Sequence, residues 1–248
     1  MKTAFITGAS SGFGEATARA LRNDGYNLII CGRRIDRLNL LSNQLGNTLA
    51  LNLDVRDKNA VFDTIKNLPK EFRNIEILVN NAGLALGQNK TQDAELDDFE
   101  TMIDTNIKGL LYVTKAILPI MIEQKSGYIF NIGSVAGVWP YAGANVYGGT
   151  KAFVEQFGYN LRNDLQGTNI RVTTIAPGLC KTEFSEVRFK GDKAKADAVY
   201  ANTKYLTAND IARIISDCAK LPSHININYL EVMPTTQSWA GFAIEKIY

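Results

Sequence analysis

The chain has 248 residues, of which 46% are hydrophobic and 21% charged, and its formal net charge is +2 at pH 7. This composition is ordinary for a globular protein, and so small a charge gives no indication of a nucleic-acid or membrane partner. One histidine and three cysteines without metal-ligand spacing argue against a metal site and against a Ser-His-Asp hydrolase. Gly8 interrupts the first apolar run, so we expect no signal peptide and a cytoplasmic protein with reduced thiols.

The first elements predict a phosphate-binding turn. An apolar run at residues 3–7 precedes a glycine-rich segment at 8–14, which leads into a helical pattern at 15–21. Glycines allow the backbone to approach an anion, and the N-terminus of the helix offers unpaired N–H groups. The spacing is G-x-x-x-G-x-G, and a loop that only turns the chain is the simpler alternative. Its position between strand and helix favours a phosphate site lined by Gly8, Ser10, Ser11, Gly12, Phe13 and Gly14.

The second predicted strand, 26–31, is followed by Gly32, Arg33 and Arg34. In a dinucleotide site the end of this strand meets the adenosine ribose, where an acidic residue binds a free 2′-hydroxyl and an arginine accommodates a 2′-phosphate. The first acidic residue here is Asp36, which falls in the next predicted helix. Two adjacent arginines could simply begin a solvated helix. In this context they predict NADP as the cofactor, because guanidinium groups bind phosphate through paired hydrogen bonds.

Strands and helices continue to alternate to the end of the chain. Several strands are rich in β-branched residues, as expected for parallel strands that are buried on both faces. We therefore predict one α/β domain over residues 1–248, a doubly wound Rossmann-type fold with a mostly parallel seven-stranded sheet flanked by helices. The further strands are predicted at 47–53, 75–80, 127–132, 170–175 and 227–232, and the further helices at 34–45, 57–68, 96–125, 147–166 and 208–221.

Small or polar residues follow several of these strands. Open α/β sheets bind ligands at the carboxyl ends of their strands, so we expect these residues to meet there. Each has an ordinary alternative, such as a turn for Asn-Asn-Ala-Gly, a helix cap for Ser134 and a strand terminator for Pro-Gly. As a set they predict cofactor contacts at Asp54, Val55, Asn81, Ala82, Gly83, Pro177, Gly178 and Thr182.

Tyr147 and Lys151 are four residues apart and therefore share one face of the predicted helix at 147–166. A free tyrosine has a pKa of about 10, so it is a poor base at neutral pH unless that pKa is lowered. An ammonium about 4 Å away, at an effective dielectric of about 20, stabilises the phenolate by about 4 kcal/mol, or about three pKa units. The spacing alone is common on exposed helices. After a nucleotide site, it predicts proton transfer at a substrate oxygen.

Taken in order, these motifs resemble the short-chain dehydrogenase/reductase family over essentially the whole chain. The resemblance rests on Thr7-Gly8-x-x-x-Gly12-x-Gly14, Asp54, Asn80-Asn81-Ala82-Gly83, Asn106, Ser134, Tyr147-x-x-x-Lys151 and Pro177-Gly178. It implies that Ser134 orients the substrate oxygen and that Tyr147 is the acid/base. Lys151 would lower the pKa of Tyr147 and hold the nicotinamide ribose, and Asn106 would hold a water that relays protons. Phe13 and the run 148–150 depart from the usual family pattern.

Within the family the chain is more similar to the NADP-dependent 3-hydroxy acid dehydrogenases, which implies serine, allo-threonine or 3-hydroxypropionate/malonic semialdehyde as substrates. This likeness lies at residues 139–147, 182–189 and 233–238. The acid group of such a substrate needs a cation, and Arg188, which is flanked by apolar residues, is the best candidate. Alternatively, Arg188 and the lysines near it solvate a mobile substrate loop, which we expect at 178–206.

Two other functions stay open at this point. One is an NADPH-dependent reductase of another ketone or aldehyde, and the other is a non-catalytic NADP-binding sensor, which the complete catalytic set disfavours. The helices at 96–125 and 147–166 have more apolar residues than one sheet face needs, which predicts contact with another subunit. The family resemblance implies a homotetramer, and the tail at 239–242 is a further candidate for that contact.

Overall fold

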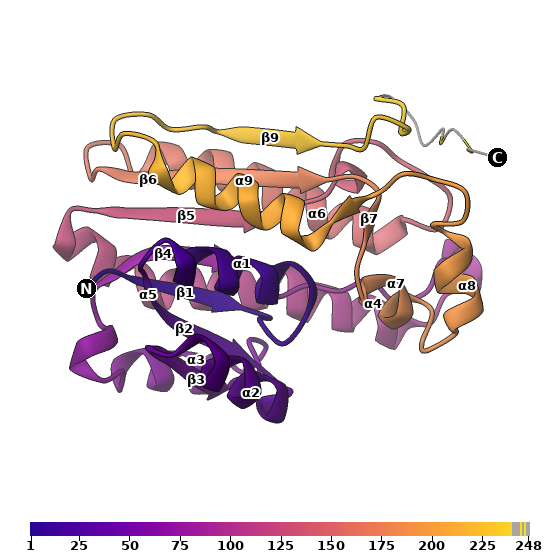
Figure 1. The fold of residues 1–248 in the computed structure, drawn as a ribbon. Helices are drawn as coiled ribbons and strands as arrows, with labels where there is room; N and C mark the ends of the chain where they lie inside the picture. The colour runs from indigo at the N-terminus through magenta and orange to yellow at the C-terminus, as the bar shows by residue number, and fades with distance from the viewer. Residues whose placement is uncertain (240–243, 245, 247–248) are drawn as a thin grey trace.

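The computed structural model describes residues 1–239, 244 and 246. Within them, seven parallel strands form one sheet in the order β3-β2-β1-β4-β5-β6-β9 (Figure 1). The predicted doubly wound α/β fold is confirmed. The strands are β1 (Thr3–Thr7), β2 (Asn27–Gly32), β3 (Thr48–Asn52), β4 (Ile75–Asn80), β5 (Gly127–Ile132), β6 (Ile170–Pro177) and β9 (Tyr229–Val232).

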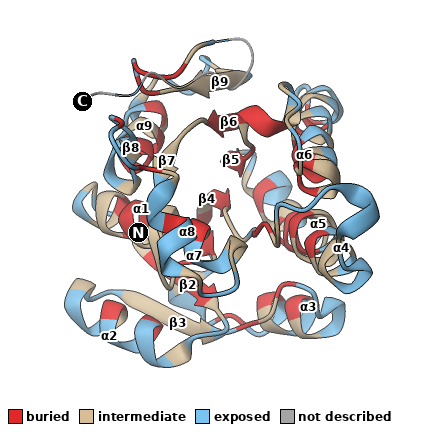
Figure 2. Ribbon diagram, turned by 90° about the vertical axis from the view of Figure 1, so that its right-hand side faces the viewer, coloured by how far each residue is buried: buried red, intermediate tan, exposed pale blue. Residues whose placement is uncertain are grey.

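Helices cover both faces of this sheet (Figure 2). Helices α1, α2 and α9 lie against one face, and α3, α5 and α6 lie against the other. Each face therefore has an apolar layer of its own. The helices are α1 (Gly12–Asn23), α2 (Ile35–Leu45), α3 (Lys58–Lys66), α4 (Leu96–Ile103), α5 (Leu110–Gln124), α6 (Asn145–Asp164) and α9 (Ala208–Lys220).

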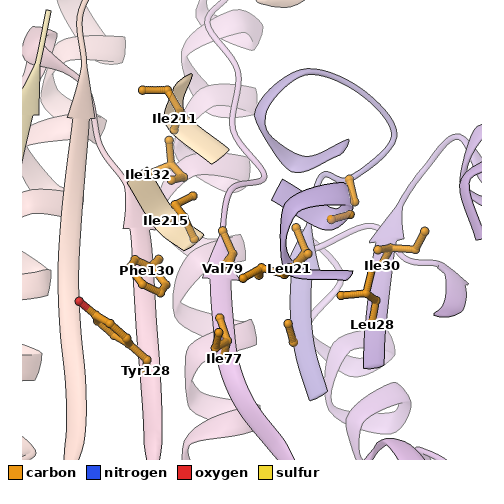
Figure 3. Packing of buried hydrophobic residues seen from close by; sticks show 14 of the residues in the cluster. Leu21, Leu28, Ile30, Ile77, Val79, Tyr128, Phe130, Ile132, Ile211 and Ile215 are labelled. Atoms are coloured by element: carbon orange, nitrogen blue, oxygen red, sulfur yellow. The ribbon is translucent and has the colours of Figure 1, made fainter. Parts of the chain in front are cut away.

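Alternation along the strands supplies both halves of the core. On β1, Ala4 and Ile6 belong to one apolar cluster and Phe5 to the other, and all three are fully buried. Leu21 of α1 and Ile215 of α9 pack into the first cluster (Figure 3). A sheet packed on both faces holds its strand ends in fixed positions, which is what a ligand site built from those ends requires.

The connections on the two sides of β1 leave a crevice at the carboxyl edge of the sheet. The strand order runs from β1 through β2 to β3 in one direction and from β4 to β9 in the other. Ligands bind outside the carboxyl ends of strands at such a reversal. Beyond these ends lies the segment 178–206, here named the cap segment (Figure 1). It contains β7 (Cys180–Lys181), α7 (Phe184–Arg188), α8 (Lys193–Ala198) and the first residue of β8 (Leu206–Thr207).

The chain is helical from Leu96 to Gln124, close to the predicted 96–125, but a π-helical turn, Asp104–Gly109, interrupts the α-helical geometry between α4 and α5. In this turn the Asn106 side chain bonds the backbone of Leu84, and Gly109 packs so closely that a Cβ there would lie 2.6 Å from Val55 Cγ2. These are contacts between segments distant in sequence, so helical periodicity does not reveal them. π turns occur frequently at functional sites.

The described part of the chain contains no helix long and apolar enough to cross a membrane. It also holds no group of three or more His, Cys, Asp or Glu side chains that could bind a metal ion. The three cysteines, Cys31, Cys180 and Cys218, are free.

Candidate active site

A cavity of about 800 Å³ lies at the carboxyl ends of the strands. It extends from the turn after β1, past the ends of β2 to β5, to the first turns of α6 and the cap segment. Nearly all the residues singled out from the sequence line it, from Gly8 at one end to Arg188 at the other. Gly14 and Asn106 are not among its lining residues.

The glycine-rich turn forms a cradle at the N-terminus of α1. Gly8 and Gly12 have φ values of 65° and 55°, a region that favours glycine. A Cβ on Gly8 would lie 2.9 Å from the Ala82 Cα atom, so the turn is also pressed against the end of β4. Ser11 caps α1 without a side-chain hydrogen bond, which leaves first-turn N–H groups available. A backbone without side chains next to uncapped N–H groups fits a pyrophosphate.

Gly14, the last glycine of this turn, is not among the residues that line the cavity, and its contact with the cofactor stays a prediction. A Cβ at this position would lie 2.5 Å from the Gly8 carbonyl oxygen and 2.6 Å from Asn81 Nδ2. Gly14 therefore faces the turn itself and lets α1 approach it closely. Asn81 completes this brace, because its Nδ2 donates to the carbonyl oxygens of Thr7, at 2.8 Å, and Gly8, at 3.1 Å.

The adenosine end of the cavity is rich in cations. Arg33 and Arg34 follow β2 and both line it. Asp54, which follows β3, is bound side-on by Arg56, with Nη2 and Oδ2 2.6 Å apart. The hydrogen bonds from Arg56 hold the pKa of the Asp54 carboxyl below its usual value. Arg56 thus fixes an ionised acceptor at one of the predicted cofactor contacts.

The predicted catalytic side chains converge at the other end. Tyr147 and Lys151 lie on the first two turns of α6 and are 8% and 6% exposed, and Ser134 follows β5. The Ser134 hydroxyl accepts from the Ala136 N–H at 3.1 Å, and it is close enough to Tyr147 to act on the pKa of that phenol. The helix cap that was the ordinary alternative for Ser134 is therefore present.

Lys151 is not directed at the phenol as the sequence argument expected. Its Nζ donates to the Ile132 carbonyl oxygen at 2.7 Å and lies 5.8 Å from the centre of the Tyr147 ring. The same Nζ would be 3.5 Å from a Cβ on Gly83, so it faces the strand-end loop that lines the cavity. One of its three N–H groups is used by Ile132. The others can reach a ligand that lies along this loop.

The pKa values differ accordingly from the expected ones. Burial raises the pKa of Tyr147 to about 12, against the opposing effects of the Ser134 hydrogen bond and the Arg188 charge. Burial also lowers the pKa of Lys151 to about 8. Lys151 is not among the causes of this shift, and desolvation outweighs the neighbouring charge of Arg188. The lowering of the Tyr147 pKa by Lys151 therefore stays a prediction.

Asn106 braces the site from behind. Its Nδ2 donates to the Leu84 carbonyl oxygen at 2.8 Å and to Thr150 Oγ1 at 3.0 Å, while its Oδ1 accepts from the Leu84 N–H at 2.9 Å. Both amide hydrogens are used within the protein, so the side chain has no donor left for a relay water. The structure supports a positioning role for this side chain, through Thr150, which in turn donates to the Tyr147 carbonyl oxygen at 2.8 Å.

Arg188 of α7 lies beside the catalytic phenol. Its guanidinium carbon is 5.1 Å from the centre of the Tyr147 ring, and its Nη2 donates to the Tyr141 hydroxyl at 2.5 Å. Its Nε is buried and has no hydrogen-bond partner in the described residues. A half-buried cation with unused donor capacity next to a proton donor is a place for a substrate anion.

Two further lining residues, Tyr141 and Gln237, were named in the sequence only within segments that resemble 3-hydroxy acid dehydrogenases, and no role was predicted for either. The Tyr141 hydroxyl accepts from Arg188. Gln237 lies after β9, and its Oε1 accepts from the Leu179 N–H at 2.7 Å in the cap segment. No spacing or motif marks either one, because only the fold brings them to the cavity.

Of the tail at 239–242, only Trp239 is described; its Nε1 donates to Glu231 Oε2 at 2.9 Å, and residues 240–242 lie outside the described part.

Comparison with known proteins agrees with this site. A family model described as short chain dehydrogenase matches residues 2–193. The chain belongs to the short-chain dehydrogenase family. It is 54% identical to the NADP-dependent 3-hydroxy acid dehydrogenase of Salmonella typhimurium over 243 residues, which is 97% of this chain and 98% of that protein. It is equally 54% identical to sulfoacetaldehyde reductase 2 of Chromohalobacter salexigens over 245 residues, or 97% of each chain.

Solved structures extend the likeness to three dimensions. The closed form of a serine dehydrogenase complexed with NADP⁺ superposes with a TM-score of 0.95 at 53% identity, covering 98% of this short-chain dehydrogenase and 99% of that chain. A serine dehydrogenase from Escherichia coli gives a TM-score of 0.85 at 48% identity, covering 96% and 100%. The fold and family inferred from the sequence are confirmed.

Proposed function

We propose that this short-chain dehydrogenase is an NADP-dependent oxidoreductase that transfers a hydride between the nicotinamide and the 3-hydroxyl carbon of a small 3-hydroxy acid. Serine, allo-threonine and 3-hydroxypropionate, or malonic semialdehyde in the reverse direction, are substrates of the proposed class. The observation that carries the proposal is the guanidinium of Arg188 beside the Tyr147 ring, which puts an anion-binding group next to the proton donor. The 3-hydroxy acid and serine dehydrogenases among its relatives support it.

In the proposed reaction NADP supplies the hydride acceptor or donor. For reduction, Ser134 donates to the carbonyl oxygen and Tyr147 delivers the proton to it, while Arg188 holds the acid group. For oxidation, Tyr147 must first lose its proton. Once that proton has gone to solvent, the Tyr147 phenolate accepts the proton of the substrate hydroxyl as the hydride leaves for the nicotinamide, and the ammonium of Lys151, whose pKa is lowered by burial, offsets the phenolate charge.

In this proposal each part of the cofactor contacts its own set of cavity residues. The turn after β1 takes the pyrophosphate, Arg33 takes the 2′-phosphate with Arg34 beside it, and Asp54 and Val55 take the adenine. Lys151 holds the nicotinamide ribose. The loops after β4 and β6 enclose the nucleoside through Asn81, Ala82, Gly83, Pro177, Gly178 and Thr182, all of which line the cavity.

A second function has support of its own. The relative from Chromohalobacter salexigens is named sulfoacetaldehyde reductase 2. The guanidinium of Arg188 could bind a sulfonate in the same way as a carboxylate. An NADPH-dependent reductase of another anionic aldehyde is therefore the alternative. A panel of substrates followed by NADPH absorbance separates the two: we expect higher kcat/KM for 3-hydroxy acids than for hydroxy sulfonates, and the reverse order would favour the alternative. Activity with neither would point to a non-catalytic NADP-binding protein.

Replacement of Arg188 with methionine should weaken selection for the acid group. Hydrogen bonds to charged groups contribute about 1.5–3 kcal/mol, so kcat/KM for a 3-hydroxy acid should fall about 10- to 100-fold, mainly through KM. Reduction of an uncharged aldehyde should change much less. The exposed Lys193 of α8 gives the matched control, because Lys193→Met removes a cation from the cap segment without touching the cavity. Equal losses for charged and uncharged substrates would show that Arg188 only supports the cap.

We also propose a cytoplasmic homotetramer. On α6, Phe153 and Phe157 stack with ring centres 5.9 Å apart and remain partly exposed, although Phe157 also packs against the core; Val154 is buried. A second apolar face on a helix that already covers the sheet suits a twofold contact between identical helices. Light scattering should give four times the monomer mass, and Phe157→Glu should lower it. A monomer at micromolar concentration would contradict the proposal.

A further inference from the structure

One acidic side chain ties the cap segment to the adenosine end of the cavity. Glu183, which directly precedes α7, accepts from Arg34 Nη1 at 2.8 Å through Oε2 and from Arg37 Nη1 at 2.7 Å through Oε1. Each carboxylate oxygen thus has its own guanidinium. Arg34 precedes α2 and Arg37 lies in its first turn, so the contact spans from the cap to the other side of the nucleotide cavity.

The two neighbouring arginines after β2 differ in what they can still bind. Arg34 is used on three sides, because its Nε donates to Ser10 Oγ at 3.0 Å and its Nη2 to Ser11 Oγ at 2.5 Å, besides the bond to Glu183. Arg33 lines the same cavity and makes no hydrogen bond or ion pair with any residue that the structure describes. Its guanidinium therefore has all its donors available to a ligand.

A neighbouring contact shows that the cap lies directly over the phosphate turn. A Cβ on Gly12 would lie 3.5 Å from the Thr182 Cβ, and both residues line the cavity. The cap and the phosphate turn therefore lie next to each other, at the end of the cavity where Glu183 meets its two arginines.

We propose that Glu183 is a positioning residue that fastens the cap over the bound cofactor through Arg34 and Arg37, while Arg33 is the residue that reads the 2′-phosphate. The inference rests on the proposed function, since it assumes a nicotinamide cofactor. It assigns different roles to two adjacent arginines. Loss of the fastening should weaken NADP⁺ and NAD⁺ alike, whereas loss of Arg33 should weaken NADP⁺ only.

The test compares cofactor dissociation constants measured by calorimetry for four proteins. Exposed ion pairs contribute little individually, so Glu183→Gln should raise Kd about three- to tenfold for NADP⁺ and by the same factor for NAD⁺. Arg33→Gln should raise Kd for NADP⁺ at least about tenfold and leave NAD⁺ unchanged. Glu186→Gln is the matched control, because Glu186 lies on α7, is exposed and does not line the cavity.

Trypsin sensitivity of the protein without cofactor gives a readout independent of activity. The cap contains Lys190, Lys193 and Lys195, and cleavage there should be faster in Glu183→Gln and in Arg37→Gln than in the wild type or in Glu186→Gln. The double variant Glu183→Gln/Arg37→Gln should be no more sensitive to trypsin than the more sensitive single variant, because Arg37 acts on the cap through Glu183.

Each result decides the proposal. Unchanged Kd values and trypsin sensitivity in Glu183→Gln would overturn the fastening role. A change confined to NADP⁺, in either direction, would show that Glu183 acts on the phosphate instead. Unchanged NADP⁺ affinity in Arg33→Gln would overturn the role of Arg33. If the wild type bound neither cofactor, the proposed function itself would fail, and this outcome differs from wild-type binding with an ineffective Glu183→Gln.

Discussion

Tyr147→Phe should reduce turnover by about 10²- to 10⁴-fold, the loss typical of a positioned acid/base group, while cofactor binding persists. The phenylalanine ring keeps the packing of a residue that is only 8% exposed and removes the proton that the reaction needs. Steady-state turnover and the calorimetric Kd for NADP⁺ are the two measurements. Tyr159→Phe is the matched control, because Tyr159 lies on the same helix, bonds Glu155 at 2.9 Å and does not line the cavity.

The direction of the Tyr147 pKa shift adds a pH dependence to this prediction. Burial raises the pKa to about 12, so the phenol that reduction requires is present throughout the neutral range, whereas the phenolate that oxidation requires is scarce. Oxidation of the hydroxy acid should therefore rise with pH, by up to about tenfold per unit, and reduction should stay flat between about pH 6 and 8. An oxidation rate that levels off near pH 7 would show that the bound cofactor and Lys151 lower the pKa as the sequence argument expected. Near-normal turnover of Tyr147→Phe with intact binding would make Tyr147 structural.

The cofactor preference should be large and reversible by substitution. If Arg33 contacts a 2′-phosphate, NADP should be preferred over NAD by at least about 100-fold in kcat/KM, since charged hydrogen bonds contribute about 1.5–3 kcal/mol each. Gly32→Asp combined with Arg33→Gln should abolish or invert this preference, because a carboxylate there repels phosphate and accepts from a free ribose hydroxyl. The new side chain fits, since a Cβ on Gly32 would have its nearest neighbour, Ser10 Oγ, at 3.7 Å.

Gly32→Ala combined with Arg33→Gln provides the matched control for this pair of changes. It introduces the same Cβ without the charge, so it should lose selectivity for NADP without gaining activity with NAD. Equal use of both cofactors by the unaltered protein would contradict the reading of the two arginines. A gain with NAD in the alanine version would show that space, and not charge, sets the preference.

The sequence predicted the parts of this protein that local patterns encode. The strands at Ile75–Asn80 and Gly127–Ile132 were predicted residue for residue, because buried apolar runs bounded by polar or glycine residues leave little choice. The glycine-rich turn and the Tyr147–Lys151 pair could also be recognised in the sequence. Both are defined by the spacing of residues within one segment of the chain.

What the sequence did not predict depends on contacts between distant segments. The π-helical turn at Asn106 exists because its side chain bonds the backbone of Leu84, 22 residues away. The raised pKa of Tyr147 depends on how the fold buries α6, and helical spacing carries no information about desolvation. In the same way, Glu183 reaches Arg34 across 149 residues, so only the folded chain shows that the cap is fastened there.

Transfer of a hydride from the 3-carbon of a hydroxy acid to NADP⁺ can be followed directly with serine that is deuterated at that carbon. NMR of the reduced cofactor then locates the deuterium. We expect deuterium at the nicotinamide C4 with the wild type, and none with Tyr147→Phe on the same timescale. Reduction of NADP⁺ without deuterium at C4, or no reduction with any hydroxy acid tested, would contradict the proposed hydride transfer.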